Sequence, residues 1–518
     1  MKTKFSGILT LFLAFVVQLT FAQEKSISGT ISDENGLPMP GVSVLVVGTS
    51  NGTQTDFDGN YSLSASTGDV IRYSSIGYKS VDKTVGASNN ISFGMEVDVT
   101  AIDEVVITAL GIKRKKDAVT SAYQEVKTEE LAKANNPDVV KGLAGKVSGL
   151  QITQNSNGVG SGGTRIVLRG NRSISGNNQA LVVIDGAISD TGFLNALDPN
   201  QIESVNVIKG ASGSALYGQQ GSNGVIVVTT KKTSKEASKM TVSINSSLDF
   251  ETVSFVPERQ TRYGQGWDLG NGFENVIYEN GGWGPEFDGQ TVPVGLPQAD
   301  GTFITAPYSS RGSDHIKEFF STGLTRQNSF SIASGDANGY VKLGARNVNR
   351  GFIIEGDNRK QNTLTFNAGK TAGKWSVGAD VIYTNSSIER HNGDLYTQLL
   401  QSASNIPITA FANSGNEGHW NAYFTNPYWN LANQRSETES NRLSLQGTLD
   451  YQVNDNISFR LLSNARINDS NALSYQNAYN EPQDIIDNTG ANRSLASNFN
   501  YNGSRSSNYY TDFFVNLD

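Results

Sequence analysis

Alternating apolar and polar residues recur through the second half of the sequence, and this pattern constrains the fold more than any other feature. Within residues 240–250 every second side chain is apolar, with one exception, and residues 375–383, 443–453, 457–461 and 509–517 repeat the alternation. A period of two is that of a β-strand with one apolar and one polar face. The pattern predicts either the strands of a transmembrane barrel, apolar toward lipid, or those of a soluble sandwich.

The lengths of the connections between these strands favour the barrel. Long or polar connections are expected at residues 251–323, 351–360, 388–439 and 469–506, and tight turns at 335–338, 371–373 and 454–456. Long extracellular loops that alternate with short periplasmic turns are typical of outer-membrane barrels, whereas a sandwich has no reason for this parity. Residues 237–518 are therefore interpreted as about eight strands of a transmembrane antiparallel β-barrel.

The N-terminus is typical of a secretory signal peptide. Lys2 and Lys4 precede an apolar run at residues 8–17, and Ala22 provides the small residue at which we expect cleavage, so residues 1–22 are assigned to the signal. No other apolar run approaches the ~20 residues of a membrane-spanning helix. A closed barrel is then the structure by which the mature chain could satisfy its backbone in a membrane.

Residues 23–99 are expected to form a small β-sandwich. Strands are predicted at residues 27–31, 42–47, 61–63, 70–73 and 91–93, separated by Asn-Gly and Asp-Gly turn signals. The segment resembles the carboxypeptidase regulatory-like domain, which is not catalytic. The residues that carry this resemblance are Gly29, Asp33, Gly36, Pro38, Pro40, Gly41 and residues 55–61.

Residues 118–236 are predicted to form a mixed α/β domain. Thr128 is expected to cap a short helix, Pro137 to open another, and strands are expected at residues 164–168, 180–184, 202–208 and 225–230. Glycines at 158, 160 and 163 satisfy a G-x-G-x-x-G pattern. A strand rather than a helix follows them, so nucleotide binding is rejected.

Six short motifs follow one another in a fixed order along this domain, at residues 143–150, 166–170, 183–186, 202–210, 215–218 and 223–232. In order and spacing they are similar to the plug of SusC/RagA-type TonB-dependent outer-membrane transporters. Within them, the plug motif residues are Arg169, Gly170, Asp185, Gly186, Lys209, Gly210, Tyr217 and Gly218. The chain departs from the family pattern at residues 219–222, where an Arg followed by small residues would be expected.

The resemblance also implies a role for a β-branched segment between the two domains. Residues 100–117 are then a TonB box and linker, and the box comprises Asp103, Glu104, Val105, Val106, Ile107 and Thr108. β-Branched residues favour an extended backbone, which can add as a strand to another protein's sheet. We call residues 103–108 the coupling segment.

The function that the resemblance implies is import of a nutrient, an oligosaccharide or a peptide, across the outer membrane of a Gram-negative bacterium. The implied partners are TonB with its inner-membrane energising complex, outer-membrane lipid and a SusD-like surface lipoprotein, with the N-terminal domain in the periplasm. Plugged transporters have about 22 strands, so the chain is expected to be the N-terminal part of a longer transporter. The alternatives are a secreted β-rich binding or adhesion protein and a truncated transporter that imports nothing.

Several aromatic residues lie in the expected loops. Possible contacts with a substrate or a lid protein are Trp267, Trp283, Trp420, Tyr428 and Trp429, and packing or contact with a lid is favoured over stacking on a sugar.

Neither an enzyme nor a nucleic-acid binder is expected. The net charge is −8, cysteine is absent, and the three histidines, His315, His391 and His419, fall in expected loops and are interpreted as solvated. No cofactor, metal site or catalytic residue is predicted.

Overall fold

In the computed structural model the chain divides into two units, Met1–Thr108 with Ile112–Thr120, and Ala109–Gly111 with Ser121–Asp518. The structure describes residues 24–517 except 35, 50, 76, 98–104, 108–112, 116–122, 134–135, 155–163, 175, 232–239, 299, 313, 337, 394 and 414–419. The expected signal peptide, residues 1–22, lies outside the described residues, as do Asp103, Glu104 and Thr108 of the coupling segment.

The first unit contains a β-sandwich. One sheet has the order β4-β1-β7, with β4 at Asn60–Ser66, β1 at Glu24–Ser32 and β7 at Phe93–Gly94. The other has the order β3-β2-β5-β6, with β3 at Gly52–Gln54, β2 at Ser43–Val46, β5 at Val70–Ser74 and β6 at Val81–Thr84. Alternate residues of β2 and β4 point into a core that includes Ile27, Ile71 and Tyr73. The sequence did not predict β3 and β6 because these edge strands are almost entirely exposed and lack the alternation.

The second unit begins with a small α/β domain, the plug. Its main sheet has the order β10-β15-β16-β13-β14, formed by β10 (Tyr123–Lys127), β15 (Ile202–Ile208), β16 (Val225–Thr230), β13 (Leu181–Ile184) and β14 (Ala187–Ser189). A separate antiparallel pair, β11 (Leu150–Gln154) and β12 (Thr164–Leu168), comes between β10 and β13 along the chain. The helices are α2 (Thr128–Ala132), α3 (Val139–Gly142), α4 (Thr191–Ala196), α5 (Ala211–Tyr217), η3 (Pro199–Gln201) and η4 (Gly218–Gly221).

The expected capping role of Thr128 is wrong. Lys127 occupies the N-cap position of α2 and makes no side-chain cap. The buried hydroxyl of Thr128 instead donates to the carbonyl oxygens of Ile202 and Glu203, so it ties the start of the helix to β15.

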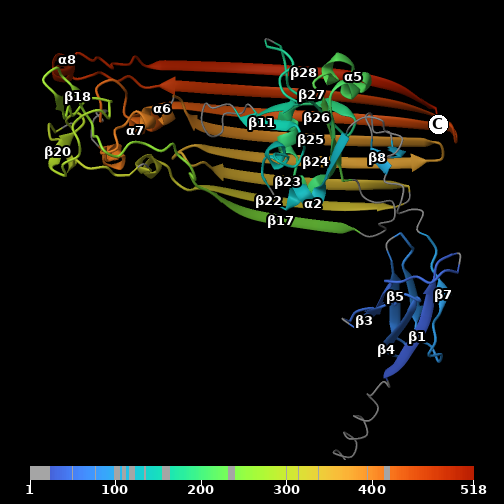
Figure 1. Ribbon diagram of the computed structural model, residues 1–518. Coiled ribbons are helices and arrows are strands. Elements are labelled where there is room, and N and C mark those ends of the chain that lie inside the picture. Colours follow the sequence, from blue (N-terminus) through green and yellow to red (C-terminus); the bar gives the residue numbers. More distant parts are fainter. Residues whose placement is uncertain are drawn as a thin grey trace, which may run out of the picture. The chain divides into compact units, whose positions relative to one another are not determined.

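The rest of the second unit is built on an antiparallel sheet of eight strands, the wall (Figure 1). In order along both the sheet and the chain, these are β17 (Thr241–Glu251), β22 (Gly323–Asp336), β23 (Gly339–Gly351), β24 (Asn358–Ala372), β25 (Trp375–His391), β26 (Gln434–Asn454), β27 (Ile457–Gln476) and β28 (Asn498–Leu517). Two-residue connections after β22, β24 and β26 alternate with longer connections at the other end. The expected parity of the connections is confirmed.

The two faces of the wall differ as the alternation predicted. On one face large apolar side chains are exposed, among them Ile244 (76%), Phe250 (69%) and Val377 (50%). On the other, polar side chains are buried, among them Gln327 and Thr363, each 2% exposed. The apolar face is the one that a lipid environment would cover.

The strands extend beyond the alternating segments. Residues 388–391, 434–439, 469–476 and 498–506 were assigned to connections from the sequence, yet they continue the ladder of β25 to β28. These stretches contain few apolar residues, and backbone hydrogen bonds continue the strands where no sustained apolar period marks them.

The long connections fold together into a loop module at one end of the wall (Figure 1). Its elements are β18 (Trp267–Asp268), β19 (Phe273–Glu274), β20 (Thr291–Val294), β21 (Ile304–Pro307), η5 (His315–Phe319), α6 (Leu395–Leu400), η6 (Ile408–Asn413), α7 (Pro427–Asn433) and α8 (Gln483–Thr489). Residues from the connections after β17 and β25 share one apolar core, which includes Val256, Phe411 and Trp420. Across the described part of the chain, no helix has both the length and the apolar character needed to cross a membrane.

Candidate functional site

The plug is held against the polar face of the wall by hydrogen bonds. Arg346 of β23, which is 5% exposed, donates to the carbonyl oxygens of Leu197 (2.8 Å) and Pro137 (2.7 Å). Gln446 of β26 donates to the carbonyl oxygen of Asp185 (2.9 Å). These bonds from side chains of the wall to backbone carbonyl groups of the plug fix where the plug sits.

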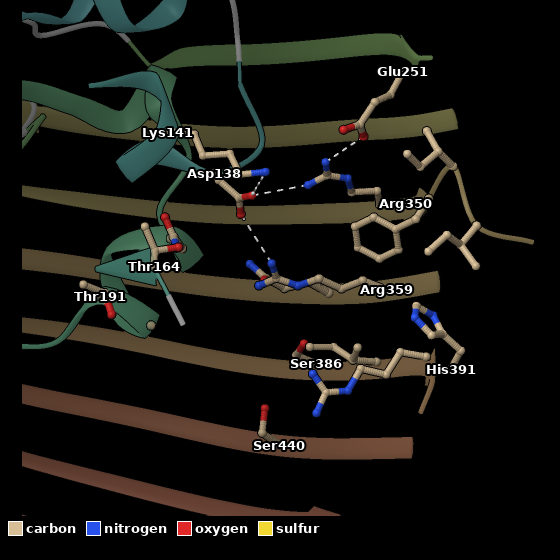
Figure 2. A pocket seen from close by; sticks show the side chains of 18 of the residues that line it. Asp138, Lys141, Thr164, Thr191, Glu251, Arg350, Arg359, Ser386, His391 and Ser440 are labelled. Carbon is tan, nitrogen blue, oxygen red and sulfur yellow. Dashed lines mark hydrogen bonds and ion pairs between the residues drawn. The ribbon is translucent and has the colours of Figure 1, made fainter. Parts of the chain in front are cut away.

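Between the plug and the wall lies a cavity of about 1410 Å³, part of which Figure 2 shows. Five consecutive strands, β23 to β27, each contribute one arginine to its lining. These residues, which we call the arginine belt, are Arg350, Arg359, Arg390, Arg442 and Arg466.

Asp138, just before α3 in the plug, lies between the first two arginines of the belt (Figure 2). Its carboxylate is 3.3 Å from Arg350, 3.3 Å from Arg359 and 3.6 Å from Lys141. Arg350 also pairs with Glu251 at 2.8 Å. Burial alone would raise the pKa of Asp138, but the surrounding positive charges outweigh it and hold that pKa below its ordinary value.

Asp138 offsets a repulsion between two positively charged side chains of the wall. Arg350 and Arg359 are direct cross-strand partners in the ladder between β23 and β24. Like charges at such positions destabilise a sheet. The carboxylate of the plug neutralises this pair, so we call the contact of Asp138 with Arg350 and Arg359 the plug latch.

The other half of the belt is less completely neutralised. Asp190, the N-cap of α4, lies 3.5 Å from Arg442 and 4.0 Å from Arg466, and its side chain is 54% exposed. The guanidinium of Arg442 occupies the space where a Cβ would project from Gly192. Arg390 makes no ion pair with any residue that the structure describes.

The coupling segment forms a strand where it is described. β8 (Val105–Ile107) pairs antiparallel with β9 (Lys113–Lys115), with Val106 opposite Arg114. The extended backbone that β-branched residues favour is therefore adopted within the first unit.

Four of the plug motif residues form two pairs with positive φ, Asp185 and Gly186 in the two-residue loop between β13 and β14, and Arg169 and Gly170 in a bend after β12. Arg169 (φ 59°) precedes Gly170 (φ 85°), and Asp185 (φ 48°) precedes Gly186 (φ 86°). Positive φ at both positions of a two-residue hairpin loop suits the right-handed twist of the strands, and Asp tolerates it better than most residues. The carboxylate of Asp185 also accepts hydrogen bonds from the backbone N–H (2.9 Å) and hydroxyl (2.7 Å) of Thr230.

The other four motif residues also organise the plug. Gly210 (φ 75°) and Gly218 (φ 61°) flank α5, and Tyr217 packs on the cluster around Val227. Lys209 donates to the hydroxyl of Ser148 at 2.8 Å. None of the eight motif residues, all of them described, lines the large cavity. The geometry gives them a role in shaping the plug.

The aromatic residues of the loops divide into exposed and packed side chains. Trp267 and Trp283 are 50% and 59% exposed. Tyr428 packs against Phe319 with ring centroids 4.9 Å apart, and Trp429 packs against Tyr479. Trp420 is completely buried, so it offers no surface to a substrate or a lid in this structure.

The prediction of solvated histidines is wrong for the two that are described. His315 is 2% exposed within the loop module, and His391 is 5% exposed, with its Nδ1 2.6 Å from Asp357. The long connections form a core of their own, so a position outside the alternating pattern does not imply exposure. His419 lies outside the described residues.

The arginine belt was not predicted from the sequence. Arg442 and Arg466 lie on the polar parity of alternating segments, and that signal was present. Arg350, Arg359 and Arg390 lie where the strands leave the alternating pattern, and only the ladder register brings all five together.

Two family models match the chain. Residues 27–107 match a CarboxypepD_reg-like domain, and residues 115–225 match the TonB-dependent receptor plug domain. Both domain resemblances drawn from the sequence are confirmed.

Two curated relatives have related functions in their names. The TonB-dependent receptor SusC of Bacteroides thetaiotaomicron is 35% identical over 329 residues, covering 62% of this chain and 31% of that protein. The TonB-dependent receptor P26 of Formosa agariphila is 40% identical over 234 residues, covering 45% of this chain and 23% of that protein. The chain spans less than a third of the length of these relatives.

Solved structures show the same fold. The RagAB peptide importer in its open-open state matches with a TM-score of 0.55 at 17% identity, over 79% of this chain and 46% of that chain. Its closed-closed state matches with a TM-score of 0.51 at 15% identity, over 77% and 54%. The expected fold class, a mainly β chain with an N-terminal sandwich, a plug and barrel-type strands, is confirmed.

Proposed function

We propose that the chain, which carries a CarboxypepD_reg-like domain and a TonB-dependent receptor plug domain and is similar to SusC, acts as a SusC/RagA-type TonB-dependent receptor in the import of an oligosaccharide or peptide across the outer membrane. The observation that carries the proposal is a plug docked on the buried polar face of an antiparallel wall whose opposite face is apolar and exposed. An entry path that opens when the plug moves requires this arrangement, and a soluble binding protein does not.

In the proposed cycle the cargo enters the cavity beside the arginine belt from the end that carries the loop module. A SusD-like surface lipoprotein covers that end, and exposed Trp267 and Trp283 supply candidate contacts with cargo or lipoprotein. Residues 23–99 lie in the periplasm, residues 100–117 hold the coupling segment, residues 118–236 form the plug and residues 237–518 belong to the barrel.

TonB supplies the force in this proposal. The coupling segment pairs as a strand with TonB, which pulls on the plug using energy from the inner membrane. The plug latch at Asp138 then has to break, since it ties the plug to β23 and β24. No bond of the cargo is made or broken, so the proposed role is transport rather than catalysis.

Proline substitution in the coupling segment tests the proposal without knowledge of the cargo. Val106→Pro removes a backbone N–H and disfavours regular strand pairing. We expect it to weaken binding of the periplasmic domain of TonB to the detergent-solubilised protein by at least ~10-fold, which corresponds to about 1.4 kcal/mol. Val106→Ile, which keeps the N–H and the β-branch, should bind like the wild type.

The readout is surface-based binding with the purified TonB domain, combined with an immunoblot of outer-membrane fractions. Equal TonB binding by the proline variant and the wild type would refute the role of the coupling segment. Absence of the wild-type protein from the outer membrane would refute the transport proposal itself.

A further inference from the structure

We propose that the cavity beside the arginine belt receives an anionic oligosaccharide, one whose sugar rings carry carboxylate or sulfate groups. This inference rests on the proposed import function and names the class of its substrate. It depends on the charges, the size and the polar groups of the cavity.

The charge of the cavity is opposite to that of the whole chain. Its lining contains six cationic side chains, the five arginines of the belt and Lys141, against the three carboxylates of Asp138, Asp190 and Glu251, which leaves a formal charge of +3. The whole chain carries −8. A concave site of one sign with low-dielectric walls concentrates ligands of the opposite sign.

The excess positive charge has a definite location. Arg350 and Arg359 are engaged by Asp138 and Glu251 at 2.8–3.3 Å. Among the described residues, Arg442 of β26 and Arg466 of β27 share the half-exposed carboxylate of Asp190 at 3.5 and 4.0 Å, and Arg390 of β25 has no ion pair. An incoming anion therefore meets its strongest unneutralised field along β25 to β27.

The arginines of this half can accept such a ligand. The Nε of Arg466 is buried with no hydrogen-bond partner among the described residues, as is the side-chain oxygen of Asn468, two residues along the same strand. Guanidinium groups bind carboxylates and sulfates through paired N–H donors. Gly192 leaves the space that the guanidinium of Arg442 occupies, which keeps that group at the cavity surface.

The size and neutral lining favour a chain of sugars over a small anion. A volume of about 1410 Å³ exceeds the ~300–1,000 Å³ of a typical small-molecule site. Between the arginines lie hydroxyl and amide side chains, among them Thr384, Ser386, Ser440 and Asn508, each able both to donate and to accept. Such groups match the hydroxyls of a sugar, whereas the side chains of an acidic peptide offer mainly acceptors. Tyr396, 45% exposed, adds an aromatic face for stacking on a ring.

Binding measurements on the detergent-solubilised full chain test the inference. The probes are hexasaccharides of galacturonate, of mannuronate and of sulfated galactose, each with an uncharged counterpart, the methyl esters or the desulfated sugar, and a hexaglutamate peptide. At least one charged sugar should bind 10-fold or more tightly than its uncharged counterpart, and its affinity should fall as salt rises.

Substitutions locate the site. Arg442→Gln should lower the affinity for the charged sugar at least 10-fold, because it removes a charge-assisted contact. Gly192→Ala should also lower this affinity, because its added methyl group displaces the Arg442 side chain. Arg505→Gln makes the same change of charge on β28 at an exposed position outside the cavity lining, and it should leave the affinity within 2-fold of the wild type.

The outcomes separate this inference from the proposed function. If no charged sugar binds better than its uncharged counterpart, or if hexaglutamate binds more tightly than every sugar, the inference is overturned, whether or not TonB binding depends on Val106. If a charged sugar binds in the belt while the Val106→Pro variant retains full TonB binding, the substrate class stands and the coupling proposal fails.

Discussion

Replacing Asp138 with asparagine removes the one negative charge of the plug latch and keeps the shape of the side chain. The wild-type carboxylate is 11% exposed and lies 3.3 Å from a guanidinium nitrogen of each of two arginines. Those arginines face one another directly across β23 and β24. The substitution therefore leaves two like charges opposed in a poorly solvated place.

The magnitude follows from these distances. Each pair at 3.3 Å has a gross Coulomb energy of about 5 kcal/mol at an effective dielectric constant of ~20. Desolvation offsets much of this, and breaking one partner out of a buried pair costs ~3–5 kcal/mol in practice. Arg350 keeps Glu251 at 2.8 Å, so we expect a loss of ~3 kcal/mol in the free energy of unfolding the plug, the lower end of that range.

Thiol labelling can follow the plug alone. The chain has no cysteine, so Val182→Cys, at a plug core position that is 2% exposed, provides a single thiol that reacts when the plug unfolds. With a urea dependence of ~1.5 kcal/mol per molar, the midpoint of labelling in detergent should fall by ~2 M in Asp138→Asn.

A matched control is available at Asp190. This carboxylate is 54% exposed and lies 3.5–4.0 Å from its two arginines. Asp190→Asn keeps a good N-cap residue and should cost less than ~1 kcal/mol. Equal midpoint shifts for the two variants, or no shift for Asp138→Asn, would show that the latch does not hold the plug.

Further outcomes are expected elsewhere in the chain. Burial and then the charge of Arg259 lower the pKa of His315 to about 4. The unfolded state therefore binds more protons between pH 6.5 and 4, and the loop module should lose up to ~3 kcal/mol across that window as pH falls. Ala403→Cys labelling should show this loss, and His315→Gln should abolish it. In the first unit, Thr55→Val removes a buried hydroxyl that donates to one backbone group at 2.6 Å and accepts from another at 2.9 Å. This substitution should lower the free energy of unfolding of the sandwich by ~2 kcal/mol, measured by hydrogen exchange, whereas Thr55→Ser should lower it by ~1 kcal/mol or less. Asp185→Ala loses both bonds to Thr230 at a positive φ and should lower the plug midpoint by ~1–2 M urea, more than Asp185→Asn.

The sequence predicted those parts of the fold in which a local pattern reports burial. Alternation located the wall because Ile244 and its neighbours face one environment and the intervening residues another. The Asp-Gly pair at residues 58–59 marked a turn of the sandwich, and Gly59 there has a φ of 73°, which few other residues adopt.

The arginines of the candidate site are brought together by the register of the strands, which a local sequence pattern does not show. Arg350 and Arg390 are distant in sequence and lie in stretches with no apolar period, so no local signal connects them. His315 was interpreted as solvated and Trp420 as a possible contact for a substrate or a lid, but two long connections pack against each other and bury both. Such a core depends on contacts between two segments, and the sequence pattern of neither segment predicts those contacts.

The pairing order of the strands has a consequence for how the chain acquires its structure. Four ladders of the wall, β22–β23, β23–β24, β24–β25 and β26–β27, join strands that are six or fewer residues apart along the chain, although residues 252–322 separate β17 from β22. The sheet of the plug instead pairs Tyr123 with Ile208 and Leu181 with Val225. Closing a longer loop before any contact forms costs more entropy and slows folding. The plug sheet therefore cannot be complete until β16 is available for pairing, whereas each of these four hairpins can form as soon as its own second strand is available.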